Sequence, residues 1–290
     1  MFHKKYIIST LVFALSLPLA LFAGGKSETT TAANDGKLQI AVSIVPQKAF
    51  VENVGFSHVS VVAEIPSGAS PENYEPTTKA MAQLEDADLY FSVGVPTEVS
   101  SILPKLPKDL PIVDQAAKVR ETLTDRQIGE GRDPHIWLSP SRAEIMVNQI
   151  AEELGKLDPE YAEYYQTNAD QYNDKIRNAA LQIKQILKED EGKSFIVYHP
   201  AFGYFADEFG LTMYALEEEG KEASPKQMAQ MIETAKEHGA KVIFYQAEID
   251  SRQADAFATE IGGKAVMLDP LSGDYVNNLI KISETFKVNL

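Results

Sequence analysis

One uninterrupted helical pattern, from Pro159 to Lys188, most constrains the fold of this 290-residue chain. After Pro159 the segment contains neither Gly nor Pro, and a helix of roughly 30 residues would extend over about 45 Å. Its large and small apolar residues fall on one stripe of the helix surface: Tyr165, Tyr172, Ile176, Ala179, Ile183 and Leu187. A helix of this length can run along a protein that has two lobes.

Alternating strand and helix patterns lie on both sides of this segment. Before it, β-rich runs cover 38–45, 59–65, 89–93, 111–113 and 135–137, with helical patterns at 77–87 and 140–154. After it, we expect strands at 195–198, 212–216, 242–245 and 265–268, and helices at 202–209, 225–238, 251–260 and 275–286. Such alternation favours parallel sheets. We therefore predict an α/β fold of two lobes, each a parallel-rich β-sheet flanked by helices, joined by one long helix. The expected boundaries are 37–157, 158–190 for the linking helix, and 191–290.

The N-terminus has the pattern of an export signal. Lys4 and Lys5 precede an apolar run at 7–22, and small residues follow at 23–25. The run is shorter than the roughly 20 apolar residues that a membrane span needs. We expect a signal peptide at 1–23, with an uncleaved anchor as the alternative, and a disordered tether at 24–36. With such a signal, we expect the protein to be exported to the periplasm or another extracytoplasmic compartment.

Charge and composition exclude several classes of function. The net charge of −15 becomes −17 when Lys4 and Lys5 leave with the signal peptide, so a nucleic-acid partner is not expected. The chain has no cysteine, which removes disulfides, thiol nucleophiles and a lipidated cysteine. Any transition-metal site must therefore use histidines and carboxylates, and we expect the protein to be unlipidated. We also expect it to be a monomer.

Two histidines and two acids have positions that favour a binding site. His199 and Asp269 each directly follow a predicted strand of the second lobe, where ligands gather in open α/β sheets. His135 lies where a short predicted strand meets a helix that begins with proline. Glu72 lies in a loop stiffened by three prolines, and such stiffness lowers the entropy lost on binding. Each residue alone is more typical of a solvated loop, but His135, His199 and Asp269 together suggest a cleft, and Glu72 is a fourth candidate.

Four segments resemble the zinc/manganese substrate-binding proteins of ATP-binding-cassette importers, a group that includes the zinc-uptake receptors. They occur in the family's order at 67–77 (SGASPENYEPT), 133–138 (DPHIWL), 199–205 (HPAFGYF) and 268–271 (LDPL). The resemblance extends from about residue 37 to the end, and implies two α/β lobes joined by a long helix. It also implies a metal site formed by Glu72, His135, His199 and Asp269, and a membrane permease as partner.

Two departures from the family pattern bear on the choice of metal. Family members usually have histidine where this chain has Glu72, and an added oxygen donor favours manganese. His199, in contrast, stands where manganese receptors tend to have a carboxylate. The segment 123–132 contains no histidine, although zinc receptors often have a histidine-rich loop there. We expect Zn²⁺ as the transported ligand, with Mn²⁺ as the alternative.

The sequence favours a binding protein that acts as a receptor over an enzyme. Two histidines and two carboxylates could instead hold a catalytic zinc in an exported hydrolase, but the chain has neither a His-Glu-x-x-His nor a Gly-x-Ser-x-Gly motif. An additional adhesin role would leave no trace in the sequence.

Glu75, Gln246 and Glu248 are candidate hydrogen-bond partners for the ligating imidazoles.

Overall fold

The computed structural model describes residues 36–217, 223–248 and 251–290. The predicted signal peptide and all of the predicted tether except residue 36 lie outside this range. So do Glu218 and Glu219 of the acidic run that begins at Glu217. Residues 36–290 cluster as one unit, which contains both predicted lobes.

The first lobe is built on a four-stranded parallel sheet with the order β2-β1-β3-β4. The strands are β1 (Leu38–Val42), β2 (Val59–Ala63), β3 (Leu89–Ser92) and β4 (Ile112–Asp114). Its helices are α1 (Val45–Gly55), α2 (Thr78–Ala82), α3 (Gln115–Arg120) and α4 (Pro140–Leu157). A two-stranded antiparallel hairpin of β5 (Gln127–Ile128) and β6 (Gly131–Arg132) follows α3. Shorter turns of helix lie at Phe56–His58, Glu98–Ile102 and Leu103–Lys105.

The second lobe repeats this plan with a parallel sheet of order β10-β9-β7-β8. Its strands are β7 (Ser194–Val197), β8 (Thr212–Ala215), β9 (Val242–Gln246) and β10 (Lys264–Leu268), each within one residue of its predicted ends. Its helices are α6 (Gly203–Phe209), α7 (Pro225–Glu237), α8 (Arg252–Glu260) and α9 (Tyr275–Asn289). A capping box begins α7, in which Ser224 and Gln227 exchange hydrogen bonds.

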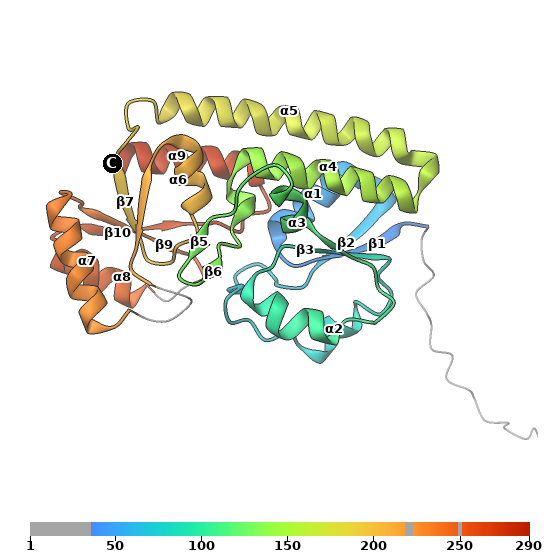
Figure 1. The fold of residues 1–290 in the computed structure, drawn as a ribbon, viewed down its shortest axis with the longest axis horizontal. Coiled ribbons are helices and arrows are strands. Elements are labelled where there is room, and N and C mark those ends of the chain that lie inside the picture. The colour runs from blue at the N-terminus through green and yellow to red at the C-terminus, as the bar shows by residue number, and fades with distance from the viewer. Residues whose placement is uncertain (1–35, 218–222, 249–250) are drawn as a thin grey trace, which may run out of the picture. The chain divides into compact units, whose positions relative to one another are not determined.

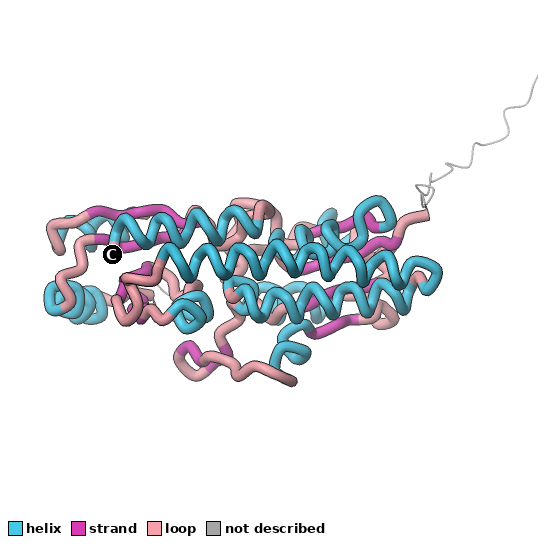
Figure 2. Tube along the Cα trace, turned by 90° about the horizontal axis from the view of Figure 1, so that it is seen from above, coloured by secondary structure: helices cyan, strands magenta, loops and turns pink. Residues whose placement is uncertain are grey.

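The long helix α5 (Ala162–Ile186) follows a short 3₁₀ turn (Pro159–Tyr161) and runs along both lobes (Figures 1 and 2). It packs against α1 and α4 of the first lobe and against α9 of the second. The stripe predicted from the sequence is buried, including Tyr165, Ile176 and Ile183. The α/β fold with two lobes and one long linking helix is therefore confirmed.

The structure corrects the sequence prediction at 135–137, where we expected a short strand. A 3₁₀ helix, η4 (Ile136–Leu138), occupies this segment. The Asp133 carboxylate accepts the His135 backbone N–H, and the Ile136 N–H donates to the Pro134 carbonyl. These local hydrogen bonds close a turn and use donors that a strand would offer to a neighbour.

Helix α1 was not expected from the sequence, which predicted a strand as far as residue 45. The strand ends at Val42 because the Gln47 side chain accepts the backbone N–H groups of Ser43 and Ile44 and turns the chain into a helix. None of the helices in the described ranges has the length and apolar character needed to cross a membrane.

Candidate metal centre

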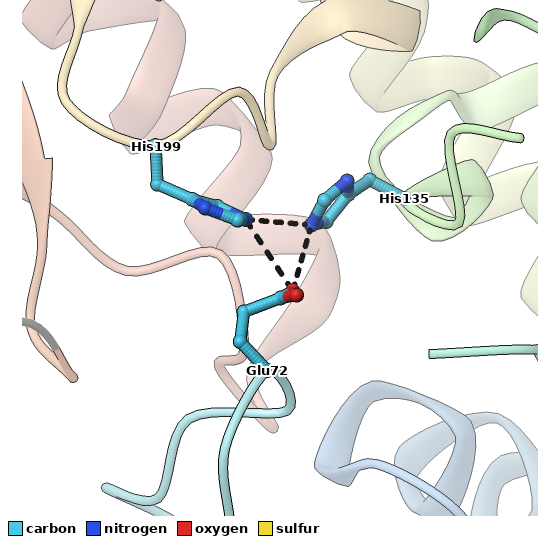
Figure 3. A group of neighbouring side chains, drawn as sticks. All are labelled: Glu72, His135 and His199. Carbon is cyan, nitrogen blue, oxygen red and sulfur yellow. Dashed lines mark hydrogen bonds and ion pairs between the residues drawn. The ribbon is translucent and has the colours of Figure 1, made fainter. Parts of the chain in front are cut away.

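Glu72, His135 and His199 meet between the two lobes (Figure 3). The two imidazole Nε2 atoms are 3.2 Å apart, and Glu72 Oε1 lies 3.4 Å from His199 Nε2 and 3.9 Å from His135 Nε2. Both histidines are 4 % exposed. Three groups that are separated by up to 127 residues thus point one ligand atom each at a common point.

A cavity of about 270 Å³ opens beside this cluster. It is lined by the three side chains and by residues of both lobes: Pro96, Ile128, Gly131, Arg132, Pro134 and Pro200. A metal ion therefore has a path to the three ligand atoms from the cleft.

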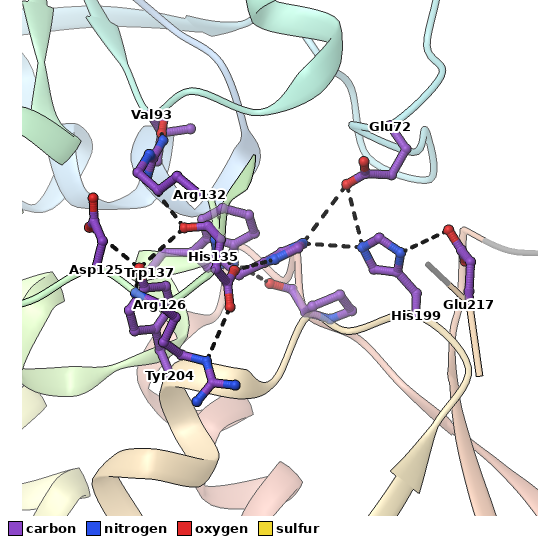
Figure 4. A network of polar contacts seen from close by, with 12 residues as sticks. Glu72, Val93, Asp125, Arg126, Arg132, His135, Trp137, His199, Tyr204 and Glu217 are labelled. Carbon is purple, nitrogen blue, oxygen red and sulfur yellow. Dashed lines mark hydrogen bonds and ion pairs between the residues drawn. The ribbon is translucent and has the colours of Figure 1, made fainter. Parts of the chain in front are cut away.

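Asp133 fixes the orientation of His135. Its Oδ1 lies 2.8 Å from His135 Nδ1 and also accepts the His135 backbone N–H at 2.9 Å. Asp133 is fully buried, and its Oδ2 lies 3.4 Å from Arg126 Nε. An imidazole that donates from Nδ1 to a carboxylate presents its Nε2 lone pair outward, which is the tautomer that binds a metal. Figure 4 shows this network of polar contacts.

Glu217 has the same relation to His199. Its Oε1 lies 3.2 Å from His199 Nδ1, and the residue is 7 % exposed although it begins an acidic run. His199 is the second residue after β7, and Glu217 is the second residue after β8, the neighbouring parallel strand. Adjacent parallel strands place their carboxyl ends at one sheet edge, which brings these two side chains together.

The charges at the cluster shift the pKa values of two of its groups. Burial by itself would lower the pKa of His199, but the hydrogen bonds and negative charges of Glu217 and Glu72 outweigh it and raise this pKa to about 9. Burial would raise the pKa of Glu72, and the opposing contacts with His199 and His135 lower it. The metal-free site thus holds an ionised carboxylate against an imidazolium.

Asp269, the fourth residue predicted for the site, lies outside the group of ligand atoms within 4.8 Å of one another. It directly follows β10, and its Oδ1 accepts the Leu271 N–H at 2.9 Å. Burial raises the pKa of the Glu248 carboxylate. The negative charge of Asp269 adds to this rise, and His199 opposes it, so both side chains lie near Glu248. Asp269 therefore belongs to the same edge of the second sheet as His199.

The imidazole partners differ from those suggested by the sequence. In the described part of the chain, Asp133 and Glu217 contact the Nδ1 atoms, and Glu75, Gln246 and Glu248 do not. The spacing Asp-Pro-His was a usable signal, because an aspartate two residues before a histidine can close a local turn. Glu217 had no comparable signal, since its burial depends on the pairing of β7 with β8.

Two α/β lobes on one long helix, with imidazole and carboxylate groups converging between them, define a solute-binding protein with a site suited to a divalent metal ion. The family described as zinc-uptake complex component A, periplasmic (ZnuA), matches residues 40–288, and the chain belongs to this family.

The chain is 30% identical to the high-affinity zinc uptake system protein ZnuA of Bacillus subtilis, over 93% of this chain and 90% of that protein. It is 28% identical to the zinc-binding protein AdcA of Streptococcus pyogenes, over 91% of this chain, but it spans only 56% of AdcA.

Solved structures show the same fold. A ZnuA deletion mutant with zinc bound is similar with a TM-score of 0.81 and 31% identity, over 87% of this chain and 98% of that one. The protein FpvC of Pseudomonas aeruginosa in complex with Mn²⁺ is similar with a TM-score of 0.76 and 27% identity, over 87% and 98%.

Proposed function

We propose that this chain is an extracytoplasmic receptor that binds one Zn²⁺ ion in the cleft between its lobes and delivers it to a membrane permease of an ATP-binding-cassette importer. The observation that carries the proposal is the convergence of Glu72, His135 and His199 on one point. Membership of the zinc-uptake family and the zinc-binding relatives support it.

We infer that Asp269 completes the ligand set, so that two imidazoles and two carboxylates hold the ion. Zinc is usually four-coordinate in closed sites with such donors. Four protein ligands leave no position for an activated water, which suits a carrier and not a catalyst. Asp269 must approach the other three ligand atoms when the ion binds. We place the lobes at 37–157 and 191–290, with 158–190 between them.

Zinc is favoured over manganese by the two imidazoles, because manganese prefers oxygen donors. Glu72 is the feature that favours manganese, since it supplies an oxygen in place of a nitrogen. The structure of FpvC in complex with Mn²⁺ makes manganese the second candidate.

Isothermal titration with Zn²⁺ and with Mn²⁺ tests the proposal on the wild type and on Glu72→Ala, His135→Ala and Asp269→Ala. We expect about one Zn²⁺ per chain, with weaker binding in each variant. Tighter binding of Mn²⁺ than of Zn²⁺ would overturn the choice of metal, and unchanged affinity in Asp269→Ala would remove that residue from the ligand set.

We further infer that the protein is not an enzyme. Sustained hydrolysis of ester, peptide or phosphoester substrates that requires zinc and is abolished by His135→Ala would show a hydrolase instead.

We also infer that the protein has no nucleic-acid partner, because the chain is acidic, and that it is unlipidated, because it has no cysteine. We expect it to act as a monomer. Intact-mass measurement of protein from its native host checks the absence of lipid.

A further inference from the structure

The loop at 66–76, which carries Glu72, is tied to the first lobe by backbone hydrogen bonds from a single residue, Thr97. Inside the loop, the Tyr74 and Asn73 N–H groups donate to the Ser70 carbonyl. Within the described ranges, both hydrogen bonds that reach the backbone of 66–76 from outside it come from Thr97. Its N–H donates to the Pro71 carbonyl at 2.9 Å, and its Oγ1 donates to the Tyr74 carbonyl at 3.2 Å.

Thr97 is itself firmly held. It is 2 % exposed and directly precedes Glu98, which is fully buried. The Glu98 carboxylate accepts the Val93 N–H and the Ser43 hydroxyl, the latter at 2.5 Å, and also accepts the Gly94 N–H. Ser43 follows β1 and Val93 follows β3, so the turn that carries Thr97 is anchored to the ends of two central strands.

We propose that Thr97 is a positioning residue for the Glu72 carboxylate and thereby sets the affinity of the metal site. Its two hydrogen bonds bracket Glu72 at Pro71 and Tyr74, and so fix the backbone from which the carboxylate reaches His135 and His199. Such pre-organisation reduces the conformational entropy that the loop loses when the ion binds. This inference rests on the proposed function, because it assigns Thr97 a role in metal binding.

The test is a double-mutant cycle on zinc affinity with Thr97→Val and Glu72→Ala. Valine keeps the volume and the backbone N–H of Thr97 and removes only the Oγ1 donor. We expect Thr97→Val to weaken zinc binding about five- to tenfold, as the loss of one buried hydrogen bond would. In the Glu72→Ala background the same substitution should cost nothing further, since it acts through Glu72. Thr97→Ser keeps the hydroxyl and should retain wild-type affinity.

Thr122→Val is the matched control, because its hydroxyl donates to the Val119 carbonyl at the end of α3, away from the cluster. It should leave zinc affinity unchanged. Thr97→Ala replaces Thr97→Val if the latter does not fold, as judged by circular dichroism, and makes the same prediction.

The outcomes separate this inference from the proposed function. An equal loss in both backgrounds would mean a general structural role for Thr97 and overturn the inference. So would unchanged affinity in Thr97→Val when Glu72→Ala weakens binding. A wild type that binds no zinc would overturn the proposed function itself, and the role of Thr97 with it.

Discussion

His135 and His199 approach each other from different lobes with their Nε2 atoms 3.2 Å apart, while carboxylates hold the Nδ1 atom of each ring. Asp133 is the partner of His135, and Glu217 is the partner of His199. The two rings are thus oriented by the same chemical device. Because each partner comes from the same lobe as its histidine, the orientation of each ring does not depend on the other lobe.

Removal of the charge from Asp133 should weaken metal binding without removing a ligand. Asp133→Asn keeps the side-chain volume but provides a weaker acceptor for His135 Nδ1–H. We expect a 10- to 100-fold loss of zinc affinity, as is typical for such partners. Isothermal titration measures it, with Asp174→Asn as control, since Asp174 is an exposed partner of Arg177. Equal affinity in Asp133→Asn and wild type would contradict the orienting role.

Zinc affinity should rise with pH up to about 9. The pKa of His199 in the metal-free protein is raised to about 9, so below that pH the imidazole holds a proton that zinc must displace. Each pH unit between 6 and 8 should then strengthen zinc binding by up to about tenfold for this proton.

Chelator competition at several pH values measures this dependence, and titrations in buffers of different ionisation enthalpy count the protons released. His199→Ala should lower the number released. A zinc affinity that does not change from pH 6 to pH 8 would contradict the prediction.

Glu64 should destabilise the protein above neutral pH. It is 2 % exposed, neither carboxylate oxygen has a hydrogen-bond partner, and burial raises its pKa from 4.5 to about 7. The folded state therefore binds a proton that the unfolded state releases, and stability falls as pH rises from about 4.5 to 7. Glu64→Gln should raise the free energy of unfolding by about 2 kcal/mol at pH 8 and change it little at pH 4.5.

Urea denaturation at both pH values checks the effect of Glu64→Gln. The exposed Glu160→Gln serves as control and should behave like wild type. A stabilisation of equal size at pH 4.5 and pH 8 would show that the effect is not one of ionisation.

Trp137 should report metal binding. It is the single tryptophan of the chain and is 1 % exposed, and its ring centroid lies 5.2 Å from that of His135. A divalent ion bound at His135 Nε2 places positive charge near the indole and should alter its fluorescence. We expect a saturable change in emission that ends at one equivalent of Zn²⁺ and is lost in His135→Ala. Emission that stays constant while calorimetry detects binding would contradict this placement of the ion.

Trp137 also joins the lobes, because its indole N–H donates to the Pro270 carbonyl at 2.8 Å. Trp137→Phe should lower the free energy of unfolding by about 1–3 kcal/mol, through the unpaired carbonyl and the lost volume. Thermal denaturation measures this change. Tyr161→Phe, at an exposed position, is the control and should show little change.

The sequence by itself determined the class of fold and the order of the elements in the second lobe. Periodicity is a local property, so the long stripe that includes Tyr165 and Ile183 and the strands of the second lobe could be predicted from neighbouring residues alone. The sequence also indicated His199 and Asp269 as candidates, because both directly follow strands predicted from it. It was wrong at 135–137, where the Asp133 side chain competes for the backbone donors of a strand.

Only the tertiary structure decided which groups meet and what surrounds them. Glu72, His135 and His199 lie far apart in the chain, and their distances depend on how two lobes pack on one helix. The burial of Glu217, the raised pKa of His199 and the attachment of the Glu72 loop to Thr97 arise from contacts between strands and loops that are not sequence neighbours. Such contacts follow from packing and hydrogen bonding in three dimensions, and no local pattern of residues contains them.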